Sequence, residues 1–538
     1  MATQLGTELL AQICGKLLDD VDGQQAVPAL ARTCRAFFEP AVDTIWRGVT
    51  SLALLAFLLP SDAWKIGDKP KRNRIISFQR VLLPSDFARF QVYGHRVRAF
   101  GAYNGSIYRL GRKYKLSRGA LAALYEARPT PPLFPNLDWA DLNQDLAPYV
   151  SMLYCPHIRA VTIRMFIARG EDPKTQALLR IPTDCPQLTS LTIYCNPLDK
   201  QVSDMMKKAV SALPNLTLFA LHEAPISIAT LEVLANFANL AHLRIALHKD
   251  SDPSGVSTNS DSKVLGFNSL RELSLNVNTL EHATHFLSCV TSPRLVMLVI
   301  SYDTLATAHE TEALFKEIES HLKLCSLQVS IRPGTPNNLP LDLPSRTLTD
   351  ITLLPLLVLR SLRVLTLHGF PIDINDVMLE AMAVAWPELS RFSLGVDMRW
   401  GAELPPRATI LALIPFIRHC PKIWSIGYRM KTDVLSRDGD PLLGFSRIGK
   451  GVVTNKEMEF NIGDSPIHDP IEVASFLSDI CPGLWYIGSL WRDGNDVDED
   501  EEGGEEDDDD GEMYGRWDMV TQYLPHFAKV RMQERNCP

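Results

Sequence analysis

Residues 270–275 read LRELSL, and this phrase decides the fold because it recurs along most of the chain. Leu270 is followed by two variable residues, then Leu273, one variable residue and Leu275. The last two leucines alternate with polar residues, which is typical of a short strand that buries every second side chain, and the first leucine marks the turn into that strand. The phrase therefore predicts a strand with one covered face.

Eight further copies of this phrase occur on both sides of it. They are Ile158/Val161/Ile163, Leu188/Leu191/Ile193, Leu216/Phe219/Leu221, Leu240/Leu243/Ile245, Leu295/Leu298/Ile300, Leu324/Leu327/Val329, Leu362/Leu365/Leu367 and Leu389/Phe392/Leu394. The starts lie 30, 28, 24, 30, 25, 29, 38 and 27 residues apart, close to the leucine-rich-repeat period of about 20 to 29 residues. Apolar helical patterns such as residues 231–237 separate the copies. The fold class predicted is α/β, a curved leucine-rich-repeat solenoid with parallel strands on the concave face and helices on the convex face.

Proline before the strands supports the same repeat. The pairs are Cys155-Pro156, Cys185-Pro186, Leu213-Pro214, Ser292-Pro293, Trp386-Pro387, Cys420-Pro421 and Cys481-Pro482. Proline stops the preceding helix, and we expect the residue before it to pack under the turn, so these cysteines are predicted to be structural rather than reactive. The later copies Ile423/Ile426 and Leu484/Ile487 are degenerate and indicate irregular or terminal repeats. An early strand is expected at Val97 and Phe100.

The first fifty residues predict three short helices. Thr7 is a plausible N-cap for a helix that runs to about Leu18, and Asp22-Gly23 is a turn signal. Pro28 is expected in the first turn of the second helix and Pro40 at the first position of the third. The apolar face of the second helix is predicted to be Val27, Leu30, Ala31 and Cys34, and that of the third Phe38, Val42, Ile45 and Trp46. Such a small module needs a partner or the following domain.

The same segment resembles an F-box, of the kind abundant in F-box-like proteins of basidiomycete fungi. The resemblance lies in residues 5–10 (LGTELL), Ile13, residues 17–18, residues 30–37 (LARTCRAF) and residues 45–46 (IW), although the family usually has proline where this chain has Gly6. It implies that the module binds the Skp adaptor, and through it the cullin scaffold of an SCF-type ubiquitin ligase. The residues expected to contact the adaptor are Leu5, Leu9, Ile13, Leu17, Leu30, Cys34 and Trp46.

The resemblance implies a substrate receptor whose solenoid binds an unknown target protein. Variable residues between the apolar strand positions would make that contact, and Arg244, Asn276 and Arg363 are candidates. An alternative is that the N-terminal helices only cap a leucine-rich scaffold without a ubiquitin role. A hydrolase built on the fold is a third class, for which the sequence offers no convergent polar residues.

The domain organisation follows from these patterns. We expect an F-box-like module over 1–48, a linker with irregular first repeats over 49–143, the solenoid over 144–492, an acidic disordered run over 493–512 and a tail over 513–538 that could form a docking helix through Trp517, Val520, Leu524 and Phe527. The acidic run would be solvated, or would contact a basic partner. Loops are expected over 250–262 and 332–344.

Composition excludes several function classes. Net charge is −9, but fourteen acidic residues lie between Asp493 and Glu512, so the rest of the chain has 49 acidic against 54 basic residues and no case for nucleic-acid binding. The short basic run at 69–74 is predicted to be a solvated linker. No signal peptide or membrane segment is indicated, and the spacing of the ten cysteines favours the cytoplasm or nucleus.

Catalytic motifs are missing from the sequence as well. No glycine-rich phosphate loop, paired Cys-x-x-Cys or nucleophile motif occurs, so no catalytic residue, metal ligand or cofactor is predicted and the protein is not expected to be an enzyme. A histidine metal site through His222, His242, His248 and His368 is a less favoured alternative to ordinary surface histidines.

Overall fold

The computed structural model describes residues 6–19, 23–67, 74–101, 114–128, 132–143, 145–165, 173–195, 200–247, 266–332, 342–435, 449, 451–491 and 508–536. Its backbone forms two compact units, Met1–Ala246 and Leu247–Pro538. The predicted loop over 250–262, most of the loop over 332–344, the basic run up to residue 73 and the acidic run up to residue 507 lie outside the described residues.

Parallel strands form the main sheet of unit 1, in the order β1-β4-β6-β7-β8-β9-β10. They are β1 Gly48–Val49, β4 Ala99–Phe100, β6 Trp139–Leu142, β7 Ala160–Met165, β8 Ser190–Cys195, β9 Leu218–Pro225 and β10 His242–Leu247. Each strand pairs with the next one along the chain in this series, as expected of a repeat in which every unit contacts only its neighbours.

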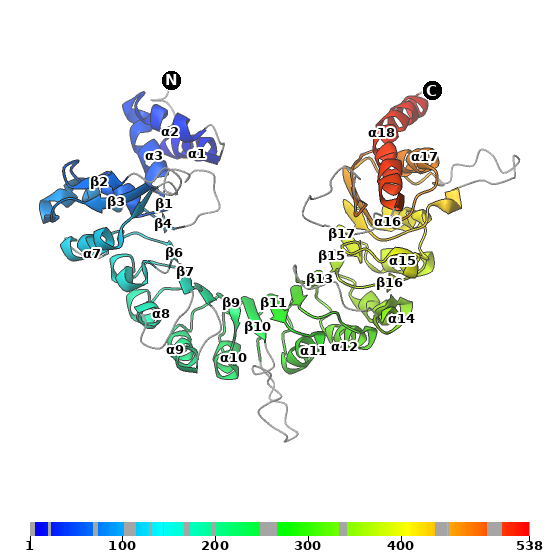
Figure 1. Ribbon diagram of the computed structural model, residues 1–538, viewed down its shortest axis with the longest axis horizontal. Helices are drawn as coiled ribbons and strands as arrows, with labels where there is room; N and C mark the ends of the chain where they lie inside the picture. The colour runs from blue at the N-terminus through cyan, green and yellow to red at the C-terminus, as the bar shows by residue number, and fades with distance from the viewer. Residues whose placement is uncertain are drawn as a thin grey trace, which may run out of the picture. The chain divides into compact units, whose positions relative to one another are not determined.

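The helices of unit 1 either precede the first strand, as α1–α3 do, or lie between strands, where α8, α9 and α10 cover one face of the main sheet (Figure 1). They are α1 Thr7–Asp19, α2 Gly23–Ala31, α3 Arg35–Trp46, α4 Ala53–Ala56, α5 Ala88–Gly94, α7 Arg118–Ala127, α8 Pro173–Asp184, α9 Lys200–Ser211 and α10 Ile228–Ala235, with 3-10 helices at Pro84–Phe87 and Ala147–Met152. A small second sheet, in the order β2-β3-β5, is inserted between β1 and α7. Its strands are β2 Trp64–Gly67, β3 Arg74–Phe78 and β5 Tyr114–Leu116.

Unit 2 repeats the same plan with the strand order β11-β12-β13-β15-β17-β18-β19-β20. The strands are β11 Glu272–Val277, β12 Met297–Tyr302, β13 Ser326–Ile331, β15 Val364–Leu367, β17 Arg391–Leu394, β18 Ser425–Gly427, β19 Met458–Gly463 and β20 Leu484–Ser489, and β14 Leu348–Thr349 pairs separately with β16 Ile372–Asp373. The helices are α11 Leu280–Cys289, α12 Ala308–Ile318, α13 Leu343–Arg346, α14 Asp350–Leu353, α15 Asp376–Ala385, α16 Leu413–His419, α17 Pro470–Ile480 and α18 Asp508–Asn536, with 3-10 helices at Leu354–Val358, Gly401–Glu403, Ile410–Ala412 and Asp433–Leu435. Within each unit the strands lie on the concave side and the helices on the convex side (Figure 1).

The core lies between the strands and the helices, and the recurring phrase builds it. All 27 apolar positions of the nine copies are at most 2% exposed, and each copy ends in a parallel strand, which confirms the predicted α/β leucine-rich-repeat-like solenoid. Burying one such side chain contributes roughly 1.5 to 3 kcal/mol. Because every copy buries three such side chains, this burial stabilises each repeat and its contacts with the neighbouring repeats.

The irregular repeats are partly as predicted. Strands β4, β18 and β20 coincide with the expected copies, and Val97 and Phe100 are buried. The gap of two periods before Leu484 holds a missed strand, β19, whose buried side chains are Met458, Phe460 and Ile462. Strand β6 was missed because its phrase, Leu137/Ala140/Leu142, has alanine at the middle position.

Four predicted details are wrong. Pro28 lies at the sixth position of α2, and α3 begins at Arg35, so that Pro40 is inside this helix and not at its start. Thr7 is the first residue of α1 and not its N-cap. The residue before the helix is Gly6, whose carbonyl accepts hydrogen bonds from the N–H groups of Leu9 and Leu10. Helix α18 begins at Asp508, so residues 508–512, which were predicted to be disordered with the rest of the acidic run, are helical.

The terminal helix α18 packs on α17, as predicted for a docking helix. Its buried side chains are Trp517, Val520, Leu524 and Ala528, which recur at intervals of three and four residues and so share one helix face. In the described part of the chain, no helix combines the length and the apolar character that crossing a membrane requires.

Candidate protein-binding surfaces

Helices α1, α2 and α3 form a module with its own small core. Cys14, Leu18, Val27 and Ala41 are buried in it, and the half-buried Leu17, Ala31, Phe37 and Ile45 pack against them. On α1, Leu9 and Ile13 form one apolar stripe and Leu10, Cys14 and Leu18 form another, and the second stripe turns inward. The core of the module is therefore closed by its own three helices.

The other stripe of α1 faces outward. Leu9 is 45% exposed and Ile13, one turn later, is half-buried, while Phe38 on α3 is also 45% exposed. Leu30 is half-buried at the end of α2, and Leu5 lies outside the described residues. Of the predicted adaptor contacts, Leu9 thus offers the most accessible large apolar side chain.

Cys34 and Trp46 are placed differently from that surface. Helix α2 ends at Ala31, because the hydroxyl of Thr33 donates to the carbonyl of Leu30 at 2.7 Å and turns the chain. Cys34 is consequently exposed at the N-cap of α3 instead of on the apolar face of α2, where the sequence predicted it. The Trp46 ring is half-buried and stacks on Tyr93, with 5.0 Å between ring centroids.

This stacking is part of a junction that joins the helical module to the first repeat. Arg96 donates to Glu39 at 2.7 Å and to Asp43, both on α3. Strand β1 follows α3 after one residue, Arg47, whose carbonyl accepts the backbone N–H groups of Arg98 and Ala99. The module is therefore tied to the sheet through α3.

The strand face of unit 1 carries a row of residues aligned by strand register. Asp141 on β6 pairs with Thr162, Thr162 with Thr192, Thr192 with Ala220, and Ala220 with Arg244 on β10. We call these five residues the register row. Arg244, a predicted target contact, is exposed at its end, and Thr162 and Thr192 are half-buried.

A second row, two residues further along the strands, is built from larger side chains. The Arg164 guanidinium lies 4.7 Å from the centre of the Tyr194 ring, and Tyr194 stacks on His222 at 4.3 Å with an interplanar angle of 6°. Burial lowers the pKa of His222, and the positive charges of Arg244 and Arg164 lower it further. Arg244 and Arg164 are therefore close enough to His222 to disfavour its protonated form.

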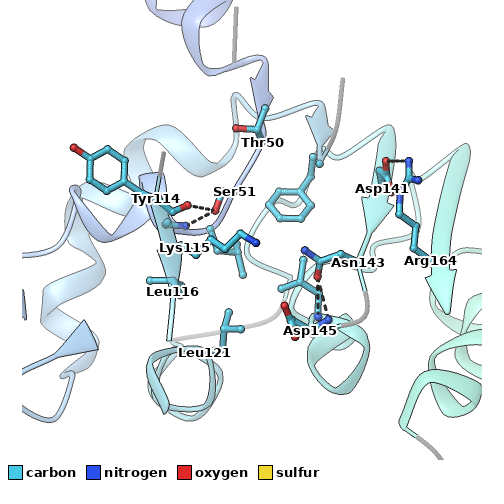
Figure 2. A pocket seen from close by; sticks show the side chains of 15 residues that line it. Thr50, Ser51, Tyr114, Lys115, Leu116, Leu121, Asp141, Asn143, Asp145 and Arg164 are labelled. Atoms are coloured by element: carbon cyan, nitrogen blue, oxygen red, sulfur yellow. Dashed lines mark hydrogen bonds and ion pairs between the residues drawn. The ribbon is translucent and has the colours of Figure 1, made fainter. Parts of the chain in front are cut away.

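A pocket of about 430 Å³ opens where the register row begins (Figure 2). Its lining comes from residues 50–53, Phe100, Gly101, residues 114–116, Leu121, Asp141, Asn143, Asp145, Leu146 and Arg164. Arg164 binds Asp141 through two hydrogen bonds, from Nε to Oδ1 at 3.1 Å and from Nη2 to Oδ2 at 3.0 Å. Neither residue was predicted from sequence, although the phrase around Ala140 would have placed Asp141 on a strand.

Unit 2 holds the other two predicted target contacts. Asn276 is half-buried on β11, in register with Ser301 of β12. Arg363 is exposed just before β15, with its Nη2 atom 3.9 Å from Glu388, which also binds Lys422 at 2.5 Å. Strands β12 and β13 lie between β11, which carries Asn276, and β15, which follows Arg363, so the two residues do not form one cluster.

Buried cysteines and scattered histidines complete the inventory of reactive groups. Cys155, Cys185, Cys420 and Cys481 are buried as predicted, and burial raises the pKa of Cys185 and of Cys420 to about 12. His222 lies in unit 1, His368 lies beside Ser393 in unit 2, and His248 is outside the described residues. The described part of the chain holds no group of three His, Cys, Asp or Glu side chains suited to a metal ion.

Comparison with known proteins gives only distant structural likenesses. No family model and no curated protein matches the sequence. Among solved structures, the chain is similar to one in the yeast Rad7 and Elc1 complex (14% identity, 59% of this chain and 73% of that chain, TM-score 0.35) and to one in the TLR13–ssRNA13 complex (14%, 74% and 52%, TM-score 0.31). A third is the APL1 leucine-rich repeat domain (10%, 62% and 83%, TM-score 0.26). At such TM-scores no family is identified, and nothing about binding partners follows.

Proposed function

We propose that this chain is the substrate-recognition subunit of a cullin-RING ubiquitin ligase of the SCF type. Helices α1–α3 would bind a Skp adaptor, and the strand faces would bind a target protein. The observation that carries the proposal is the exposure of two large apolar side chains, Leu9 on α1 and Phe38 on α3, on a module whose core is formed by its own helices. Exposed apolar side chains on neighbouring elements are typical of a partner site.

The chain would act by holding a bound target close to the ligase. An adaptor bound to α1–α3 is held to the first repeat through Trp46 and Arg96, so that a target on the strand face stays near the ligase. Such tethering raises the effective concentration of the target at the ligase without chemistry in this chain. The predicted absence of catalytic residues is compatible with this role.

The test is co-elution of the full chain with a purified Skp adaptor by size-exclusion chromatography. Leu9→Asp and Ile13→Asp should abolish co-elution, because each would bury a charge in an apolar interface. Leu322→Asp is the matched control, since Leu322 is 61% exposed and lies in unit 2. Normal co-elution of a folded Leu9→Asp, Ile13→Asp double variant would contradict the proposal.

A second candidate is a leucine-rich scaffold whose N-terminal helices only cap the repeats. The observation that favours it is the continuity of α3 with β1 together with the Trp46–Tyr93 stacking. In that case the wild-type chain would not bind the adaptor. Point variants discriminate better than deletion of residues 1–48, because deletion would also remove Gly48, which pairs with Ala99.

A further inference from the structure

The pocket at the start of the register row has both apolar and polar walls and is large enough for a bulky side chain. Phe100, Leu121 and Leu146 contribute to its lining, and a volume of about 430 Å³ is within the range of small-ligand pockets. Its charges are balanced, since Asp141 is bound by Arg164 and the lining holds one further cation and one further carboxylate, Lys115 and Asp145. A neutral side chain is therefore the better occupant.

The far end of the register row has a different character. Arg244 is exposed, and no carboxylate of the described residues lies within ion-pair distance of it. The charges that act on the neighbouring His222 are those of Arg244 and Arg164, both positive. This end of the row favours an anionic group.

The distance between the pocket at β6 and Arg244 on β10 follows from the spacing of the strands. Four strand spacings lie between β6 and β10, which is about 19 Å at about 4.8 Å per spacing, and an extended peptide covers that distance with about six residues. Between the ends the row has only the small side chains of Thr162, Thr192 and Ala220, while Arg164, Tyr194 and His222 lie beside it. Among the described residues, the row therefore carries only small side chains between its two ends.

We propose that the strand face of unit 1 binds an extended peptide segment of the target, with a large apolar side chain in the pocket beside Asp141 and a carboxylate at Arg244. The two anchor residues of the segment are about six positions apart. This deepens the proposed function, on which it rests for the identity of the segment as part of a ligase target.

The experiment uses a random dodecapeptide library displayed on phage and selected on the immobilised full chain. Enriched peptides should share an aromatic or large aliphatic residue and an acidic residue at the proposed spacing. Enrichment without such a spaced pair, or no enrichment, would overturn the proposal.

One enriched peptide, made synthetically with a fluorescent label, then tests the two ends by fluorescence anisotropy. Arg244→Glu should weaken binding about tenfold or more, and exchange of the acidic residue of the peptide for lysine should restore binding to this variant. Lys115→Trp, which fills part of the pocket, should also weaken binding about tenfold, while Arg391→Glu is the control because Arg391 is exposed on β17 in unit 2. Equal affinity of the wild type and Arg244→Glu would refute the assignment of the anionic end.

The adaptor assay separates this inference from the proposed function. Arg244→Glu and Lys115→Trp should co-elute with the adaptor as the wild type does. If the wild type binds no adaptor but selects the spaced peptides, the ligase role fails and the peptide site stands. If it binds the adaptor and selects no such peptide, the reverse holds.

Discussion

At the scale of single residues, one position of the repeat connects each unit to the one before it. Three residues before the first apolar strand position stand Cys155, Ser292 and Cys420, and their side chains donate to backbone carbonyls of the preceding repeat. The Ser292 hydroxyl reaches the Leu270 carbonyl at 2.8 Å. A buried donor with a partner costs little, whereas an unpaired one is destabilising.

His321 occupies the same position, three residues before Leu324, and its Nε2 atom is buried without a hydrogen-bond partner among the described residues. Burial lowers the pKa of His321, and a hydrogen bond that the ring donates to the backbone carbonyl of Ser292 opposes this in part. The native state therefore keeps the imidazole neutral, while the unfolded chain binds a proton as the pH falls below about 6.5. The free energy of unfolding should decrease as the pH falls through this range.

His321→Cys introduces the side chain that related repeats use there, and should reduce this pH dependence. Urea unfolding of the full chain at pH 7.5 and at pH 5.5, followed by circular dichroism, measures it. The exposed His95→Gln is the control and should unfold as the wild type does at both values. An identical loss of stability in His321→Cys and wild type would show that His321 is not responsible.

At the scale of elements, α18 stabilises the end of unit 2. Trp517 and Trp491 both donate their ring N–H groups to the carbonyl of Ser465 at 3.0 Å. Arg531 donates to the hydroxyls of Ser478 and Ser475 on α17 at 3.1 and 3.0 Å. Apolar burial and these hydrogen bonds together attach the helix to the last repeat.

Trp517→Ala should lower the free energy of unfolding of the last repeats by about 3 to 5 kcal/mol, because it leaves a large cavity and removes one of the two hydrogen bonds to the Ser465 carbonyl. Hydrogen exchange of α17 and β20, followed by mass spectrometry, measures the effect. Tyr523→Ala, on the same helix but 39% exposed, is the matched control and should change exchange little. Equal protection in both variants would mean that α18 does not stabilise the repeat.

At the scale of the whole molecule, stability is distributed along the repeats. Each strand pairs with its neighbours in the series, and the chain divides into two compact units. In such proteins stability is approximately a sum of repeat and nearest-neighbour terms. A core substitution should therefore act mainly on its own unit.

Leu191→Ala tests this expectation, since Leu191 is fully buried on β8. It should destabilise unit 1 by about 2 to 5 kcal/mol and accelerate hydrogen exchange there far more than in unit 2. Thr192→Ala, the next residue on the open strand face, is the matched control. Uniform acceleration across both units would indicate one cooperative fold instead.

Much of the architecture was predictable because apolar alternation is a local signal. Every copy of the phrase became a buried strand, including Leu216/Phe219/Leu221, where an aromatic ring replaces a leucine. Strand β6 departs from that signal, since Ala140 is too small to stand out. The helix positions predicted for Pro28 and Pro40 were wrong because contacts within the helical module stabilise α2 and α3 although each helix contains a proline.

The sequence by itself determined the repeat, its strand face and the buried residues before each strand, because the alternation of buried and exposed side chains is a pattern within one short segment. Only the tertiary structure decided which polar residues meet. Asp141 and Arg164 are 23 residues apart and become partners through the register of β6 and β7. The Trp46 ring packs on Tyr93, a residue distant in sequence. On α1, Leu9 and Ile13 are more accessible to solvent than Leu10 and Cys14. Register and helix packing depend on long-range contacts, which no local pattern contains.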